Sequence, residues 1–306
     1  MSRLRLAPAL ISIAAVSALA LTGCSSSGGS KTPAGGSSGS TSSTSSTAAS
    51  SSSAASGAAA LVPASIKSKG SLTIAMDATY APDESIDTDG KTIIGFDADL
   101  AKAVSADLGL KADLVNATFD TIIPGLQSGK FDVGFSSFTD TKDREKTVDF
   151  VTYFQAGEGF YVKAGSSKKF DGLASLCNAS VAVEKGTTEE SDAQAQGKKC
   201  KVTVLSFPDQ NAANLAVSSG RAEVGFVDSQ IAGYIVKQSN GQFALTGTAF
   251  EVAPYGIALP KGNGMTAAVL QAVKDLIANG TYKTILTKWG VADGAITTPV
   301  INGAQS

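Results

Sequence analysis

The segments "SGKFDVGF" (residues 128–135) and "SGRAEVGF" (residues 219–226) share one pattern: a Ser-Gly pair, a basic residue, an acidic residue and the triplet Val-Gly-Phe. Glycine just after a helical segment is a common helix stop, and Val and Phe favour strands. Each segment therefore predicts a helix that ends and passes directly into a strand. The repetition indicates two lobes built alike, although two ordinary helix-to-strand joints that match by coincidence are the alternative.

The sequence around these two segments alternates short apolar strands with amphipathic helices, which predicts an α/β fold with largely parallel strands. The first set of predicted elements covers residues 71–76, 96–109, 111–116, 119–129 and 131–136. The second set covers residues 180–186, 187–197, 201–207, 208–220 and 222–228. In open parallel sheets ligands bind beyond the carboxyl ends of the strands, so two such lobes place a ligand in the cleft between them.

Two extended runs link the sets. Residues 159–167 ("GFYVKAGSS") and 254–264 ("PYGIALPKGNG") read as strands that carry the chain to the second lobe and back. The helices predicted at 265–280 and 281–290 then pack on lobe 1. We expect lobe 1 at 61–160, lobe 2 at 161–257, and the return to lobe 1 at 258–306.

Composition excludes several classes of function. The 306 residues include 25 Lys and Arg against 27 Asp and Glu, so the balance of charge does not favour nucleic acid as a partner. There is no histidine, which excludes Ser-His-Asp and Cys-His nucleophiles and histidine zinc sites. Neither a phosphate-binding loop nor a dinucleotide fingerprint occurs. We expect no cofactor, no metal and a monomeric chain.

The amino terminus has the features of an export signal. Residues 1–23 combine Arg3 and Arg5 with an apolar stretch, and small residues lead to Cys24. A transmembrane anchor is the alternative, but polar sequence follows too soon. "LTGC" resembles the bacterial lipobox, in which the cysteine is lipidated, and residues 24–60 are a Ser-, Gly- and Ala-rich linker unable to form a core.

Two cysteines remain in the exported part, Cys177 and Cys200. An even pair in an oxidising compartment predicts a disulfide, with two free thiols as the alternative.

Hydroxyl side chains follow the first repeated strand, and one arginine comes shortly after them. The hydroxyls are those of Ser136, Ser137 and Thr139. Arg144 presents a planar fork that suits a carboxylate, so the segment predicts a carboxylate cradle. The alternative is a solvated helix in which Arg144 pairs with Asp140 or Glu145.

The second repeated strand ends in an acid. Asp228 stands where lobe 1 has its serines and would receive an ammonium group, unless it caps the following helix. Thr187 and Thr188 begin another helix, whose free N–H groups favour an anion. Together these residues suit a ligand that carries both a carboxylate and an ammonium group, such as an amino acid.

From about Ser71 to Val291 the chain resembles the ABC-importer solute-binding proteins of the polar amino-acid family, family 3. The segments that carry the resemblance are "DATYAP", "GFDADLAKAV", "FDTIIPGLQSGKFDV", "SSFTDTKDREKTVDF", "VAVEKGTT", "GFVDSQ" and "GTYKTILTKWG". The resemblance implies a type II periplasmic-binding-protein-like fold, with two mostly parallel sheets joined by a two-strand hinge. It also implies an extracytoplasmic lipoprotein that performs no chemistry and delivers an amino acid to membrane permease subunits.

The resemblance assigns roles to single residues. Arg144 corresponds to the carboxylate clamp, with Thr139 and Thr188 assisting through backbone amides. Ser137 and Asp228 correspond to the ammonium partners.

Further positions concern the ligand's side chain. Tyr80 and Phe119 correspond to the aromatic residues that sandwich the ligand, although Phe119 also suits plain core packing. Asp77 stands where members that bind cationic amino acids carry an acid.

Asp83 and Glu84 stand where many members carry an aromatic residue, which leaves the identity of the substrate open. With Asp77 and Asp97 they concentrate acids around the expected side-chain pocket, so a cationic ligand (arginine, lysine or ornithine) is expected and glutamine is the alternative. The other interpretation is that Asp97 caps its helix and that Asp83 and Glu84 are exposed turn residues.

Two other functions share this fold family. An enzyme resembling cyclohexadienyl dehydratases is one, and a sensor that works without a transporter is the other. The lytic transglycosylases that resemble the family carry an added catalytic domain, which this sequence lacks. We expect no enzymatic activity.

Replacing Cys24 by alanine is expected to abolish incorporation of a radiolabelled fatty acid, because the thiol is the predicted attachment point. The parent and the Cys24→Ala variant are labelled in cells and compared on a denaturing gel. Equal labelling of the two proteins would place the lipid elsewhere.

Overall fold

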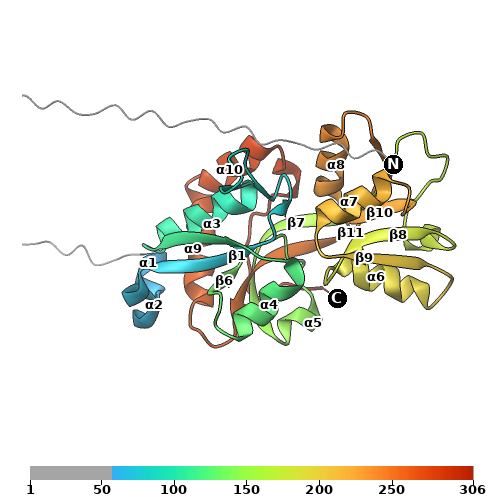
Figure 1. The fold of residues 1–306 in the computed structure, drawn as a ribbon. Coiled ribbons are helices and arrows are strands. Elements are labelled where there is room, and N and C mark those ends of the chain that lie inside the picture. The colour runs from blue at the N-terminus through green and yellow to red at the C-terminus, as the bar shows by residue number, and fades with distance from the viewer. Residues whose placement is uncertain (1–56, 306) are drawn as a thin grey trace, which may run out of the picture. The chain divides into compact units, whose positions relative to one another are not determined.

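The computed structural model describes residues 57–305, which form an α/β fold of two lobes (Figure 1). An eight-stranded sheet has the order β5-β1-β6-β11-β7-β10-β8-β9, and a small three-stranded sheet has the order β2-β3-β4. The predicted two-lobed α/β fold is confirmed. Cys24 and most of the predicted linker lie outside the described residues.

Lobe 1 contains the strands of the first predicted set and the small antiparallel sheet. Its elements up to the crossing strand are α1 (Ala58–Leu61), α2 (Ala64–Lys69), β1 (Ser71–Met76), β2 (Thr79–Tyr80), β3 (Glu84–Ile86), β4 (Ile93–Ile94), α3 (Phe96–Asp107), β5 (Lys111–Asn116), α4 (Phe119–Gln127), β6 (Val133–Gly134) and α5 (Lys142–Glu145). β1 pairs in parallel with β5 and β6, and Figure 1 shows α3 and α4 on opposite sides of these strands.

Lobe 2 contains the second set. Its elements are a 3-10 turn (Leu173–Leu176), β8 (Ser180–Glu184), α6 (Thr188–Gly197), β9 (Thr203–Phe207), α7 (Gln210–Ser218), β10 (Val224–Asp228) and α8 (Ser229–Gln238). β8 pairs in parallel with β9 and β10. Helix α6 covers one side of these strands, and α7 and α8 cover the other (Figure 1).

Two long antiparallel strands run through both lobes. They are β7 (Val148–Lys163) and β11 (Phe243–Pro260), and they pair along most of their length. β11 also pairs with β6 in lobe 1, and β7 pairs with β10 in lobe 2. The sequence predicts two sheets joined by a hinge, whereas hydrogen bonding across β7 and β11 makes the two sheets continuous.

After β11 the chain forms two more helices and a last turn. Helices α9 (Thr266–Ala278) and α10 (Thr281–Trp289) bury one apolar face each, and a last 3-10 turn covers Ala292–Gly294. The side chains of Lys288 and Trp289 both donate to the Asp99 carboxylate of α3, at 2.6 Å and 2.9 Å. No helix within residues 57–305 combines the length and the apolar character needed to cross a bilayer.

Close packing explains why both repeated Val-Gly-Phe triplets contain glycine. A Cβ atom at Gly134 would lie 2.9 Å from the Ile122 side chain, and one at Gly225 would lie 2.1 Å from the Tyr161 ring. Both glycines are therefore needed because another side chain packs directly onto the strand backbone.

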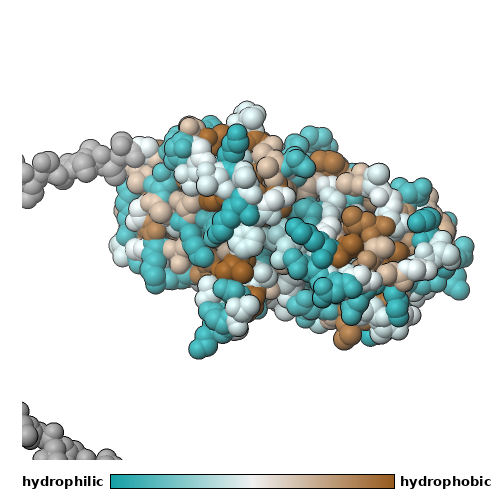
Figure 2. All heavy atoms as spheres, turned by 90° about the horizontal axis from the view of Figure 1, so that it is seen from above, coloured by the Kyte–Doolittle hydropathy of each residue, from teal (hydrophilic) through white to brown (hydrophobic). Residues whose placement is uncertain are grey.

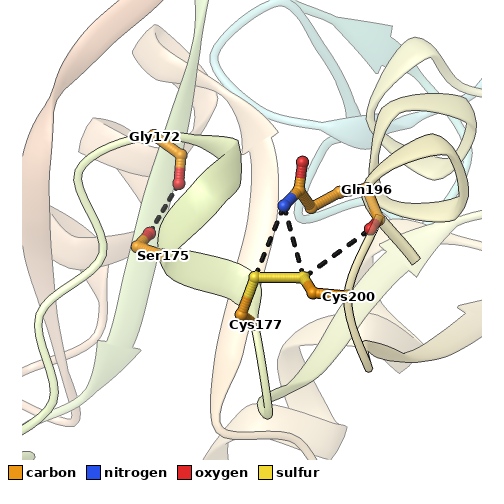
Figure 3. Close-up of a disulfide and its surroundings, with 5 residues drawn as sticks. All are labelled: Gly172, Ser175, Cys177, Gln196 and Cys200. Carbon is orange, nitrogen blue, oxygen red and sulfur yellow. Dashed lines mark hydrogen bonds between the residues drawn. A yellow bond between two sulfur atoms is a disulfide. The ribbon is translucent and has the colours of Figure 1, made fainter. Parts of the chain in front are cut away.

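Cys177 and Cys200 form a disulfide, which confirms the predicted pairing (Figure 3). The bond joins the residue after the 3-10 turn to the chain just beyond α6. The side-chain amide of Gln196 donates to both sulfur atoms, at 3.4 Å and 3.3 Å.

Removing this bond should lower the free energy of unfolding by about 3 kcal/mol, since it closes a loop with a sequence separation of 23 residues. Urea unfolding of the Cys177→Ser, Cys200→Ser double variant measures the loss. Reductant should destabilise the parent and leave the double variant unchanged. A parent with two alkylatable thiols in its native state would contradict the pairing.

Candidate functional site

A narrow cavity lies where the two lobes meet, with room for about one water molecule at its centre. Eight of the ten predicted ligand-binding residues line it. The full lining is Tyr80, Phe119, Ser137, Thr139, Arg144, Thr187, Thr188, Glu189, Val227 and Asp228. The structure thus brings together side chains from both halves of the chain, as the position of the strand ends predicts.

Arg144 reaches this cavity from α5, whose first turn is capped by the Thr141 hydroxyl. Its guanidinium donates to the carbonyl oxygen of Thr139 at 2.8 Å and, across the cleft, to that of Gly186 at 2.9 Å. Its central carbon also lies 5.3 Å from the ring centre of Phe119. Among the described residues Arg144 makes no ion pair, so the alternative of a solvated helix with an Arg144 salt bridge is not what the structure shows.

The amino end of α6 faces Arg144 from lobe 2. The Thr187 side chain caps the helix by accepting from the Glu190 amide at 3.1 Å. The Thr188 hydroxyl lies 3.4 Å from that of Thr139 in lobe 1. The hydroxyls of Thr139 and Thr188 and the amino end of α6 therefore line the same cavity as Arg144, a combination that suits an anionic group.

Asp228 closes the cavity at the end of β10. It stands at the N-cap position of α8, but its side chain makes no capping hydrogen bond. Burial, followed by the charge of Glu189, raises the pKa of Asp228 well above its usual range. The carboxylate is thus free of a helix-capping duty and available to a cationic group.

Glu189 and Val227 line the cavity without having been predicted from the sequence. Glu189 is only 3% exposed, and its Oε1 atom has no hydrogen-bond partner among residues 57–305. The sequence predicts that Glu189 lies in the first turn of a helix. It does not predict that the side chain points into the cavity, because an acid in a first helical turn is ordinarily explained by the helix dipole.

Two predicted residues, Asp77 and Ser136, lie behind the cavity lining. The Asp77 carboxylate accepts from the Thr79 hydroxyl at 2.7 Å and from the Phe119 amide at 2.9 Å. The Ser136 hydroxyl accepts from the Asp77 amide and donates to Glu84 at 2.6 Å. They hold β1 and the start of α4 in place.

Glu184, at the end of β8, faces Asp77 from the other lobe. It is 1% exposed, and neither of its oxygens has a hydrogen-bond partner within the described part of the chain. Burial raises its pKa to about 10, with the charge of Asp77 as the next cause. The Tyr80 hydroxyl nearby is also buried without a partner. The sequence offered no signal for Glu184, because a strand-end glutamate is usually exposed.

The acids that follow β2 are buried, not exposed turn residues. Asp83 accepts from the Ser137 hydroxyl at 2.8 Å and from the Gln230 amide of lobe 2 at 2.8 Å. Asp97 does not cap its helix: its Oδ2 accepts from the Ser137 amide and from the Tyr153 hydroxyl. Burial raises the pKa of Asp97 to about 7.

The two predicted aromatic residues contact each other. The Tyr80 and Phe119 rings meet edge to face, with centroids 5.8 Å apart, and Phe119 also stacks on Phe138 at 4.4 Å. In this closed arrangement they form one aromatic wall of the cavity.

Further contacts hold the lobes together around the site. Lys185 of lobe 2 pairs with Asp120 of lobe 1 at 2.8 Å, and the Gln210 amide donates to the Thr79 hydroxyl at 3.2 Å.

Comparison with known proteins identifies the family of the chain. The model of the bacterial extracellular solute-binding proteins, family 3, matches residues 72–292. The chain belongs to this family. The arginine-binding protein ArgT of Corynebacterium glutamicum is 31% identical over 251 residues, covering 79% of this chain and 82% of that protein. The ABC transporter glutamine-binding protein GlnH of Bacillus subtilis is 35% identical over 209 residues, covering 66% and 75%.

Solved structures of similar proteins agree with the fold. An ancestral arginine-binding protein bound to arginine superposes with a TM-score of 0.69 at 36% identity, covering 72% of this chain and 98% of that one. An ancestral amino-acid-binding protein, described as a precursor of cyclohexadienyl dehydratase, superposes with a TM-score of 0.67 at 35% identity, covering 74% and 97%.

The raised pKa of Glu184 predicts how the stability of this family 3 protein depends on pH. An unfolded glutamate has a pKa of about 4.3. Between that value and about 10 the folded chain holds a proton that the unfolded chain has lost, so stability falls as pH rises through this window. Glu184→Gln should therefore raise the free energy of unfolding near pH 8 by about 1 kcal/mol or more.

Urea unfolding near pH 4 and near pH 8 measures this difference, which should almost vanish at the lower pH. The exposed Asp293→Asn variant serves as the charge-matched control and should show no such pH dependence. An equal loss of stability in Glu184→Gln at both pH values would contradict the assignment.

Proposed function

We propose that this chain is the lipid-anchored, extracytoplasmic solute-binding component of an ABC importer. It captures an L-amino acid, preferably a cationic one, between its lobes and delivers it to membrane permease subunits. The observation that carries the proposal is the cavity in which Arg144 of lobe 1 faces Asp228 and the amino end of α6 in lobe 2. The relatives' names, which refer to arginine, glutamine and cystine, support the ligand class.

The two ends of the cavity suit the two charges of an amino acid. Arg144 and the amides of Thr139 and Thr188 bind the α-carboxylate, because a guanidinium forms strong paired hydrogen bonds with it. Asp228 and the Ser137 hydroxyl receive the α-ammonium group. The cavity is too narrow for an amino acid in the closed arrangement, so the lobes separate for the ligand to enter.

The preference for a cationic side chain rests on the charge balance around the cleft. Asp77 and Glu184 face each other across it, and Glu184 has no hydrogen-bond partner in the described part of the chain. Burial opposes ionisation of Glu184, which therefore keeps its proton while no cation is near. A guanidinium or ammonium group placed beside Asp77 and Glu184 lets Glu184 ionise and pairs its charge. A neutral ligand such as glutamine does neither.

Delivery to a permease requires exposed surface on the lobes. Figure 2 shows a largely hydrophilic or neutral face with a patch of hydrophobic residues over the lobe 2 half. Exposed large apolar side chains of this half include Leu215, Leu245 and Val252. Exposed apolar side chains of this kind suit the binding of a partner protein.

A calorimetric screen of L-amino acids against the ligand-free protein tests the proposal. Arginine, lysine or ornithine should bind, and Arg144→Ala should weaken that binding by at least about 30-fold, since breaking a buried charge pair costs about 2 to 5 kcal/mol. Lack of binding by every amino acid would overturn the proposal, and turnover of arogenate or prephenate would establish the enzyme instead.

Two further variants test the side-chain preference. Glu184→Gln and Asp77→Asn should each weaken arginine binding about 10-fold or more, which is about 1.4 kcal/mol, and barely change glutamine binding. Asp293→Asn controls for net charge. Equal losses for arginine and glutamine would show that these carboxylates do not recognise the side chain.

A further inference from the structure

Three carboxylates outside the ligand cavity converge on the side of lobe 2 that carries α6. They belong to Glu158, Asp192 and Glu251, and one oxygen of each lies within 4.8 Å of the others. None of the ion pairs formed among residues 57–305 involves any of the three. Three carboxyl groups therefore meet without a basic side chain among the described residues to pair with them.

Glu158 shows that this cluster is more than a solvated acidic surface. Its side chain is only 6% exposed, and its Oε2 atom has no hydrogen-bond partner in the part of the chain that the structure describes. A buried carboxylate without a partner is neutralised either by a proton or by a cation. Surface acids, in contrast, are satisfied by water and need neither.

The fold brings the three side chains together from separate elements. Glu158 lies in the middle of the large sheet, where β7 pairs with Asp228 of β10 on one side and with Phe250 of β11 on the other. Asp192 lies one helical turn after Thr188 on α6. Glu251 lies in β11 at a register shift, with a φ angle of 48°, and such bulges redirect side chains.

We propose that Glu158, Asp192 and Glu251 form a binding site for a divalent cation, specifically Ca²⁺. All three donors are hard carboxylate oxygens, which excludes the softer metals that prefer nitrogen and sulfur. Ca²⁺ binds oxygens at about 2.3 to 2.6 Å, so two oxygens on opposite sides of the ion are about 4.6 to 5.2 Å apart. The three oxygens all lie within 4.8 Å of one another, so all of them can reach one Ca²⁺ ion. The flexible coordination of Ca²⁺ suits such an irregular set better than the near-ideal octahedron that Mg²⁺ demands.

A cation at this position links α6 to β7 and β11. The same helix presents Thr187, Thr188 and Glu189 to the ligand cavity, so the ion fixes one wall of the cavity relative to the strands that join the lobes. Water and nearby carbonyl groups complete the coordination shell, as is common for Ca²⁺.

Calorimetric titration of CaCl₂ into the chelator-treated full-length protein at neutral pH, without amino acid, tests the site. We expect one saturable site with a dissociation constant of about 10⁻⁴ to 10⁻³ M, the range of extracellular calcium modules, and weaker binding of MgCl₂. Because no amino acid is present, the result is independent of the proposed transport function.

Single variants then assign the ligands. Glu158→Gln should abolish the Ca²⁺ signal, and Glu251→Gln, whose side chain is exposed and does not endanger folding, should weaken it at least 10-fold. Asp171→Asn, an exposed acid elsewhere in lobe 2, is the matched control and should bind like the parent. The absence of saturable Ca²⁺ binding by the parent, or an unchanged affinity in Glu251→Gln, would overturn the site and leave a protonated Glu158 as the explanation.

Discussion

The pairing of β7 with β11 is the interaction on which the rest of the structure depends. These strands carry the backbone hydrogen bonds that make the lobe sheets continuous, and β10 and β6 are each paired to one of them. Because the strands are antiparallel and long, the ends of β1, β6, β8 and β10 come to face one cleft. The cavity residues meet for this reason, although the sequence separates Tyr80 from Asp228 by more than half of the described chain.

The cleft has a second property, an excess of buried acid over buried base. Among the described residues that line the cavity, Arg144 is the one cation, against the acids Glu189 and Asp228. Asp77 and Glu184 lie behind this lining. Desolvation opposes the ionised form of each acid, and neighbouring acids add to the effect. The closed state consequently keeps Glu184 protonated at neutral pH. Under the proposed function, these acids are the physical basis on which the cleft would distinguish a cationic amino acid from a neutral one with the same head group.

The sequence predicted the fold well because its strands appear as short apolar runs and its helices show the regular apolar spacing of an amphipathic helix. The strand at Ser71–Met76 and the helix starts at Phe96 and Phe119 agree with the structure. Eight of the ten predicted ligand-binding residues line the cavity, since strand ends in such folds face the cleft. Glu189, Glu184 and the burial of Asp83 were not predictable, because whether an acid points to solvent or to the cleft depends on how the lobes meet. The merging of two sheets into one was missed for a similar reason: the sequence marks a strand but not the full extent of its pairing.

The placement of the disulfide has a consequence for motion. Both cysteines, which Figure 3 shows bonded, belong to lobe 2. The segment that the bond closes, residues 177–200, includes no part of β7 or β11. The covalent cross-link therefore reinforces one lobe against unfolding while imposing no tether on the hinge. Oxidation therefore stabilises lobe 2 and adds no covalent constraint on the movement of one lobe relative to the other.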